Sequence, residues 1–421
     1  MNIELHTDRS LIRANGNSNR YLLARFTAPV AERRTSRPPV NVAFVIDRSG
    51  SMAGQKLILA KQAVHTAISL LRPSDRFAIV VYDSEVDVVT PSTGATADAK
   101  RSAVRALAKI DPRNSTDLGE GWLRGCEQVA ATQDERYVSR VLLLTDGLAN
   151  QGIVDPEELR THASALRARG VMTTTIGLGE DFNEELLRGM ARAGGGNFYF
   201  VEGAAQILDT MMSELQETLE IVARDVALTV SGPDVVLVEP LTDAVVERIG
   251  QTWRLRLGDA VSEQEFEVVI RVNFPAGAVD REIAAQVALE DRDGVMHAAS
   301  TVTWRYADHH RNDMQDRDAT VDRIVAQLYA ARARQEAVAL NRHGQYAAAR
   351  SALKRVTDRI RGYAGDDREL ASIIGGLEEE AKEFSVEMNE MSRKRAYYAS
   401  SNVSAMRTSE GKARKRPTGT R

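Results

Sequence analysis

One short segment constrains the fold of this chain more than any other, an apolar run that ends abruptly in polar residues. Residues 42–46 are all apolar, and Asp47-Arg48-Ser49-Gly50-Ser51 follows directly. Apolar residues then recur every three or four positions over 55–71, which predicts a helix. A buried strand, a polar loop and an amphipathic helix in this order are typical of a parallel α/β sheet. The loop should lie at the carboxyl end of the strand, where open α/β sheets bind their ligands.

The oxygen atoms on this loop are of a kind that suits a hard cation. Asp47, Ser49 and Ser51 offer one carboxylate and two hydroxyls, which favour Mg²⁺ or Mn²⁺ over zinc or copper. Serine and aspartate after a strand also act as turn formers and helix N-caps, so this loop alone leaves both interpretations open. Two more loops favour a metal site, because Thr116 precedes a second helix pattern and Asp146 follows a second apolar run.

These residues together resemble the metal-ion-dependent adhesion site of von Willebrand factor type A (VWA) domains. The resemblance covers residues 39–222 and rests on D-x-S-G-S-M at 47–52, S-T-D-L-G-x-G at 115–121 and L-L-T-D-G at 143–147. It implies one bound divalent ion, with Mg²⁺ or Mn²⁺ expected before Ca²⁺.

The resemblance also implies a role for each residue of the site. Hydroxyls bind the ion directly in that family, so Ser49, Ser51 and Thr116 are the implied direct ligands. Asp47 and Asp146 are implied to act mainly from the outer sphere. One coordination position is left for an acidic side chain of a partner protein, because an ion with few charged inner ligands keeps most of its positive charge. A VWA domain that holds metal without an adhesive use is the alternative.

Loops around the open position would set the specificity for the partner. We expect this rim to lie in the loops at 83–85 and 147–151 and to include Asp83, Glu85, Gly147 and Asn150. The chain has no G-x-x-x-x-G-K-[ST] motif, so no nucleotide site is expected. The three loops also carry no spare histidine or glutamate apart from Glu120, and hydroxyl ligands do not generate a strong base. We therefore expect no catalytic residues and no enzymatic activity.

Composition narrows the class of protein. A length of 421 residues predicts two to three domains, and a net charge of −4 gives no general attraction to nucleic acid. The single Cys126 forbids an internal disulfide and lies on an apolar helix stripe, which indicates a buried thiol. No basic and apolar leader opens the sequence, and no apolar run reaches the ~20 residues that span a bilayer. The expectation is a cytoplasmic bacterial protein without a membrane span.

Strand and helix patterns alternate over residues 39–222. This alternation predicts a doubly wound, mostly parallel α/β sheet with helices on both faces. Strands are expected at 42–46, 76–82, 141–144, 171–177 and 197–201, an edge strand at 86–89, and helices at 55–71, 97–109, 118–132, 156–169, 183–193 and 204–222.

After residue 222 the apolar pattern changes to a period of two, most clearly over 266–274. Such alternation between turn signals is typical of an antiparallel β-sandwich. Residues 1–38 carry further strand patterns but are too few to form a core alone. We expect 1–38 and 223–306 to form one sandwich into which the VWA domain is inserted. YfbK-like bacterial proteins, inter-alpha-trypsin inhibitor heavy chains and calcium-activated chloride channel regulators are similar in this layout.

The remainder of the chain is expected to be helical. Residues 307–319 have the composition of a polar linker, and 320–395 predict helices at 320–341, 346–361 and 367–393. The third helix carries an apolar heptad stripe, which either packs against its two neighbours or docks a partner or a second copy of the chain. Residues 396–421 are basic and are expected to be disordered.

The function that best fits these features is a metal-ion-dependent protein-binding module, used as an adaptor or scaffold. A self-assembling scaffold that acts through the helix at 367–393 is the first alternative, and a metal-assisted hydrolase is a less favoured one. The identity of the partner does not follow from the sequence.

Overall fold

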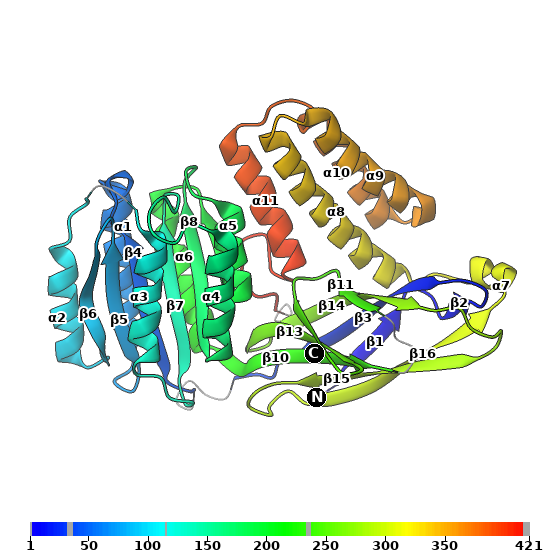
Figure 1. Cartoon of the computed structure of the whole chain (residues 1–421), viewed down its shortest axis with the longest axis horizontal. Helices are drawn as coiled ribbons and strands as arrows, with labels where there is room; N and C mark the ends of the chain where they lie inside the picture. The colour runs from blue at the N-terminus through cyan, green and yellow to red at the C-terminus, as the bar shows by residue number, and fades with distance from the viewer. Residues whose placement is uncertain (1, 32–36, 114–115, 233–236, 416–421) are drawn as a thin grey trace. The chain divides into compact units, whose positions relative to one another are not determined.

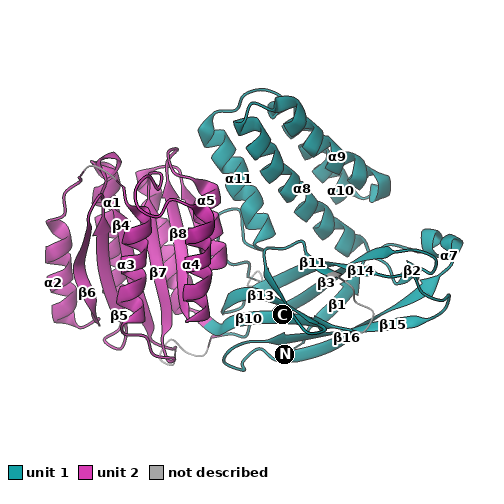
Figure 2. Ribbon diagram, viewed as in Figure 1, with its two compact units in different colours: residues 1–30, 222–421 teal, residues 31–221 magenta. Residues whose placement is uncertain are grey.

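The computed structural model describes residues 2–31, 37–113, 116–232 and 237–415, drawn in Figure 1. Contacts between Cα atoms divide the chain into two compact units. One unit is residues 31–221, and the other combines residues 1–30 with residues 222–421 (Figure 2). The second unit is therefore built from two stretches of chain that are far apart in the sequence.

The first unit is an α/β sheet of six strands in the order β6-β5-β4-β7-β8-β9. The strands are β4 (Val40–Asp47), β5 (Arg76–Tyr82), β6 (Val86–Gly94), β7 (Val138–Thr145), β8 (Val171–Leu178) and β9 (Gly195–Val201). Neighbouring strands pair in parallel except β6, which runs antiparallel to β5 at the edge. Strands β4, β7 and β8 are buried throughout, as expected for a sheet that is covered on both faces.

Helices cover both faces of this sheet (Figure 1). They are α1 (Gln55–Leu70), α2 (Ala97–Ala108), α3 (Leu118–Ala130), α4 (Pro156–Ala168), α5 (Glu184–Ala193) and α6 (Ile207–Leu219). Apolar residues of α1, α2 and α6 share one core with the sheet, whereas α3, α4 and α5 contact the strands from the other side. The predicted doubly wound fold is confirmed.

Two glycines let α3 approach the sheet closely. A Cβ atom on Gly125 would lie 2.3 Å from a methyl carbon of Val45, and one on Gly121 would lie 2.4 Å from the Tyr82 ring. Neither position has room for a larger side chain. The close packing fixes the N-terminal end of α3, which Asp117 caps by accepting a hydrogen bond from the Glu120 amide.

The second unit contains a β-sandwich of two sheets, with strand orders β1-β3-β14-β11 and β12-β13-β10-β15-β16-β2. The strands are β1 (Glu4–Thr7), β2 (Leu11–Arg13), β3 (Ser18–Thr27), β10 (Ile221–Ser231), β11 (Leu237–Pro240), β12 (Val245–Ile249), β13 (Thr252–Val261), β14 (Glu265–Phe274), β15 (Glu282–Glu290) and β16 (Ala298–Ala307). Strand β3 pairs with β14 from Thr27 opposite Glu265 to Ser18 opposite Phe274. The N-terminal strands thus complete the sandwich, although β2 pairs with β16 in parallel rather than antiparallel.

The helices that follow are α7 (His309–Met314), α8 (Ala319–Arg342), α9 (Tyr346–Ala364), α10 (Arg368–Glu383) and α11 (Glu390–Ser404). The expected single helix over 367–393 is wrong, because the chain leaves α10 at Phe384 and starts α11 at Glu390. The buried Asn341 of α8 satisfies the backbone groups at this break. Its amide nitrogen donates to the carbonyls of Phe384 (3.1 Å) and Val386 (2.7 Å), and its oxygen accepts from the Met388 amide (3.2 Å).

The predicted apolar stripe of α10 packs within its own chain. Leu370, Leu377 and Phe384 are at most 2% exposed and belong to a core shared with α8 and α9. This is the first of the two expected arrangements. The stripe is consequently covered and does not form a free surface for self-assembly.

Two other segments are more ordered than expected. The linker at 307–319 contains α7, whose buried Asn312 accepts a hydrogen bond from Arg20. Disorder was expected over 396–421, yet residues up to Ser404 belong to α11 and the chain then returns to β14, where the Glu265 amide donates to the Arg414 carbonyl (2.8 Å). Pairing with a sandwich strand fixes this basic segment, and 416–421 lie outside the described residues.

None of the helices in the described residues combines the length and the apolar character needed to cross a membrane.

Candidate metal centre

Three loops meet at the carboxyl edge of the parallel sheet. Strands β4 and β7 are neighbours, with Ile46 opposite Leu144, so Asp47 and Asp146 leave the sheet at the same edge. Thr116 precedes α3, which packs against both strands. The sequence-predicted residues therefore reach one place because parallel strands end together.

The carboxylate of Asp47 is fully buried and held on both oxygens. Oδ1 accepts a hydrogen bond from the Ser49 amide (2.8 Å), and Oδ2 accepts one from the Thr145 hydroxyl (2.8 Å). Burial raises the pKa of Asp47 to about 6, because the hydrogen bonds from Ser49 and Thr145 only partly offset the cost of charging the group away from water. The negative charge of Asp146 raises this pKa further.

Ser49, Ser51 and Asp146 form a continuous chain of oxygen atoms. The two serine hydroxyls are 3.0 Å apart, and the Ser51 hydroxyl donates to Asp146 Oδ1 at 2.6 Å. Thr116 lies beside them, since a Cβ atom on Gly147 would be 3.7 Å from its hydroxyl oxygen. Ser49, Thr116 and Asp146 are buried, whereas Ser51 is exposed. All five predicted ligand residues thus lie at one edge, and Ser51 is the member that solvent reaches most easily.

A lysine that the sequence analysis missed also belongs to this group. Lys56 lies in the first turn of α1, and its ammonium nitrogen is 2.6 Å from Asp146 Oδ2. Its place in the first turn of the helix that follows the Asp47–Ser51 loop is the sequence signal that could have indicated it. The carboxylate of Asp146 is therefore paired with the positive charge of Lys56 in this structure.

The backbone of the first loop is anchored by a buried ion-pair network. Arg48 is buried and donates from Nε to Asp83 Oδ2 at 2.7 Å, and it also contacts Asp87. Arg113 donates to the same Asp83 oxygen at 2.7 Å, and its amide donates to the Arg48 carbonyl at 2.8 Å. These contacts hold Arg48, the residue between Asp47 and Ser49, in place.

Asp83 is consequently not a rim residue, and that expectation is wrong. Its side chain is 2% exposed and is already paired with Arg48 and Arg113. Of the other expected rim residues, Glu85 has a 73% exposed side chain, Asn150 is exposed and Gly147 is partly exposed. Leu148 lies within the expected loop at 147–151, next to Gly147, and is an apolar residue that is 52% exposed.

The donor set fits a hard divalent ion. It consists of oxygen atoms only, two carboxylates and three hydroxyls, on the residues Asp47, Ser49, Ser51, Thr116 and Asp146. Over the described ranges, no group of three or more His, Cys, Asp or Glu side chains is arranged to hold a metal ion. A zinc site of the usual histidine and cysteine type is therefore absent from that part of the chain, and the hydroxyl-rich edge has the chemistry that Mg²⁺ and Mn²⁺ prefer.

Comparison with known families assigns this part of the chain. The family model of the von Willebrand factor type A domain matches residues 41–214. These residues form a VWA domain. VWA domains commonly act as metal-dependent protein interaction modules and typically bind a divalent ion at the adhesion site.

Relatives with similar sequences include bacterial and vertebrate proteins. The chain is 31% identical over 191 residues to the uncharacterized protein YfbK of Escherichia coli, a match that covers 45% of this chain and 33% of YfbK. It is 26% identical over 278 residues to sll0103 of Synechocystis, which covers 63% of this chain and 64% of that protein. It is 30% identical to human inter-alpha-trypsin inhibitor heavy chain H3 over 36% of this chain and 18% of that one. In each case the chain spans less than two thirds of its relative.

Solved structures resemble the chain over nearly its whole length. A von Willebrand factor type A protein from Catenulispora acidiphila matches with a TM-score of 0.70 and 17% identity, over 98% of this chain and 97% of that one. VWA2, the ArnB paralog from Sulfolobus acidocaldarius, matches with a TM-score of 0.57 and 15% identity, over 92% and 99%. These likenesses extend the shared fold beyond the VWA domain to the sandwich and the helices.

Proposed function

We propose that this protein is a metal-ion-dependent protein-binding module rather than an enzyme. Ser49, Ser51 and Thr116 would bind one divalent ion directly, and Asp47 and Asp146 would support it. The main observation in favour is the chain of oxygen atoms from Ser49 through Ser51 to Asp146, beside the buried Asp47. A bound ion would supply a positive charge to which a carboxylate of another protein can bind.

The charges at the site support a cation. Asp47 and Asp146 are both buried, and the ammonium of Lys56 is the positive charge that touches Asp146. Arg48 is engaged by Asp83 and Asp87. A divalent ion would offset the repulsion between the two carboxylates, which a single lysine offsets only in part.

Calorimetry tests the ion. We expect the intact protein to bind Mg²⁺ and Mn²⁺ more strongly than Ca²⁺, and Ser51→Ala to weaken binding at least about tenfold because one direct ligand is lost. Ser69→Ala is the matched control, since the hydroxyl of this exposed serine of α1 donates to the Thr66 carbonyl of its own helix. Equal affinity of the intact protein and Ser51→Ala would refute the assignment.

The partner is proposed to supply a glutamate or aspartate. Ser51 is exposed, so an ion bound there can be reached from solvent. The rim would then consist of Glu85, Gly147 and Asn150, with Leu148 as an apolar contact in place of Asp83. An acidic residue next to an apolar one in the partner would fit this combination of an ion and an exposed leucine.

Affinity capture tests the dependence on the ion. Bound partners should be lost in the presence of chelator and restored by Mg²⁺, and Thr116→Ala should lose the same partners while remaining folded. Thr161→Ala is a suitable control, because its exposed hydroxyl bonds only to the Glu157 carbonyl of its own helix. If the same proteins are captured with chelator present, recognition does not run through the metal.

A further inference from the structure

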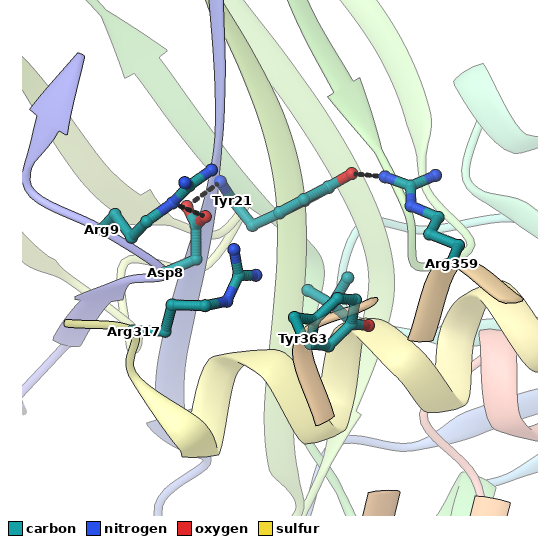
Figure 3. Close-up of a pocket in the computed structure, with 7 residues that line it drawn as sticks. Asp8, Arg9, Tyr21, Arg317, Arg359 and Tyr363 are labelled. Atoms are coloured by element: carbon teal, nitrogen blue, oxygen red, sulfur yellow. Dashed lines mark hydrogen bonds and ion pairs between the residues drawn. The ribbon is translucent and has the colours of Figure 1, made fainter. Parts of the chain in front are cut away.

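A small cavity lies between the sandwich and the helices of the second unit. Its volume is about 130 Å³, room for several water molecules at roughly 30 Å³ each. Its lining, shown in Figure 3, is Asp8, Arg9, Tyr21, Arg317, Val325, Arg359 and Tyr363. Asp8 follows β1, Tyr21 lies on β3, and Arg359 and Tyr363 lie on α9, so the cavity is closed by elements distant in sequence.

Arg359 is the most unusual residue of this lining. Its guanidinium donates to the Tyr21 hydroxyl and lies 4.1 Å from the centre of the Tyr329 ring. Within the part of the chain that the structure describes, no carboxylate pairs with Arg359. Figure 3 shows its side chain reaching Tyr21 from one side of the cavity, while Arg9 and Arg317 lie near Asp8 on the other.

The other two arginines of the lining are paired with one carboxylate each, Asp8 and Asp322. Arg9 pairs with Asp8 at 3.3 Å, and Arg317 pairs with Asp322 through both of its carboxylate oxygens. Arg20 also lies near Asp8, and burial together with the positive charge of Arg9 lowers the pKa of Arg20 to about 10. Positive charge therefore exceeds negative charge around the cavity.

We propose that this cavity binds a phosphate group, either free phosphate or the phosphate of a small monoester. Guanidinium forks match the oxygen geometry of phosphate. The guanidinium carbons of Arg317 and Arg359 lie over tyrosine rings, 4.6 Å and 4.1 Å from the ring centres. The hydroxyl of Tyr21, which is 2.9 Å from that of Tyr329, adds a polar group to the lining. The volume is enough for a tetrahedral oxyanion.

The position of the cavity gives binding a structural consequence. Asp8 accepts from the Tyr21 amide at 2.7 Å, and its carbonyl accepts from the Asp318 amide at 3.0 Å just before α8 begins. A phosphate here would join the sandwich to α9 through Arg9 and Arg359. Because it binds only the folded arrangement, it should raise the thermal unfolding midpoint as its concentration rises.

Titration of the full-length protein with inorganic phosphate tests this site. Arg359→Gln should weaken binding roughly tenfold to hundredfold, the effect of losing one charged hydrogen-bond donor. Arg355→Gln is the matched control. Arg355 lies one turn earlier on α9, is 63% exposed and pairs with Glu336. The Arg355→Gln variant should therefore bind phosphate as the intact protein does.

A second ligand and a second variant complete this experiment. O-phosphoserine that binds more tightly than phosphate would identify a monoester as the ligand, and phosphate that binds more tightly would identify the free anion. If Arg359→Gln is poorly folded by circular dichroism, Arg9→Gln replaces it, with the same expected loss. The proposal is wrong if the intact protein binds neither anion, if acetate binds as tightly as phosphate, or if Arg355→Gln loses as much affinity as Arg359→Gln.

Discussion

At the scale of single residues, the candidate metal centre is shaped by side chains that are not among the proposed ligands. Arg48 sits between two predicted ligand residues and is fixed by Asp83, which is why Asp83 is buried rather than available to a partner. Lys56 lies against Asp146 from the following helix. The sequence pattern indicated the ligands because their spacing is local to three loops. It could not indicate the Arg48 network, because Asp83 and Arg113 reach it only through the folded sheet.

The position of Lys56 leads to a prediction about the affinity for Mg²⁺. Its positive charge beside Asp146 repels a divalent ion, so Lys56→Gln should tighten Mg²⁺ binding by roughly two- to fivefold, the range expected for one partly exposed charge. Isothermal titration of Lys56→Gln and Lys61→Gln compares a lysine at the site with one on the same helix that bonds to the Ile110 carbonyl instead. An unchanged or weaker affinity in Lys56→Gln would mean that the lysine positions Asp146 for the ion.

At the scale of secondary structure, the helical region differs most from the prediction. The apolar stripe of α10 continues in sequence through Phe384, and periodicity alone gave no reason to end the helix there. The decisive residue is Asn341, which lies on α8 and bonds to the backbone of the break from across the bundle. Asn389 then caps α11 by accepting from the Ser392 amide at 2.8 Å. A cap can be read from sequence, but a bond between residues more than forty positions apart cannot.

Asn341 accordingly should be sensitive to mutation. Asn341→Ala would leave the buried Phe384 carbonyl, the partly buried Val386 carbonyl and the Met388 amide without this partner, at a cost of about 3 kcal/mol in the free energy of unfolding. Gln345→Ala, the loss of an exposed amide side chain four residues later, should cost little. Denaturant unfolding monitored by circular dichroism measures both, and similar values for the two variants would contradict the role given to Asn341.

At the scale of the whole molecule, the chain passes from one unit to the other and back. The change of apolar period near residue 222 predicted the second crossing, and the shortage of core residues in the first segment predicted the first. The pairing of the strands could not be predicted from the sequence. No local sequence pattern indicates that β3 pairs with β14, or that β2 joins the opposite sheet in parallel. The stacked rings of Phe26 and Phe266, 4.9 Å apart, show how closely the two distant segments share one core.

Deleting residues 1–30 tests this division of the chain. The deletion removes β3 from β14, exposes the apolar face that Leu22, Ala24 and Phe26 cover, and leaves β14 with an unpaired edge. Residues 31–221 lose none of their own strands and should still fold and bind Mg²⁺. Limited proteolysis of the truncated protein should therefore cleave within β10–β16 and spare the VWA domain. Cleavage at the same sites and rates as in the intact chain would show that the N-terminal strands are dispensable for the sandwich, and loss of Mg²⁺ binding would show that the VWA domain depends on them.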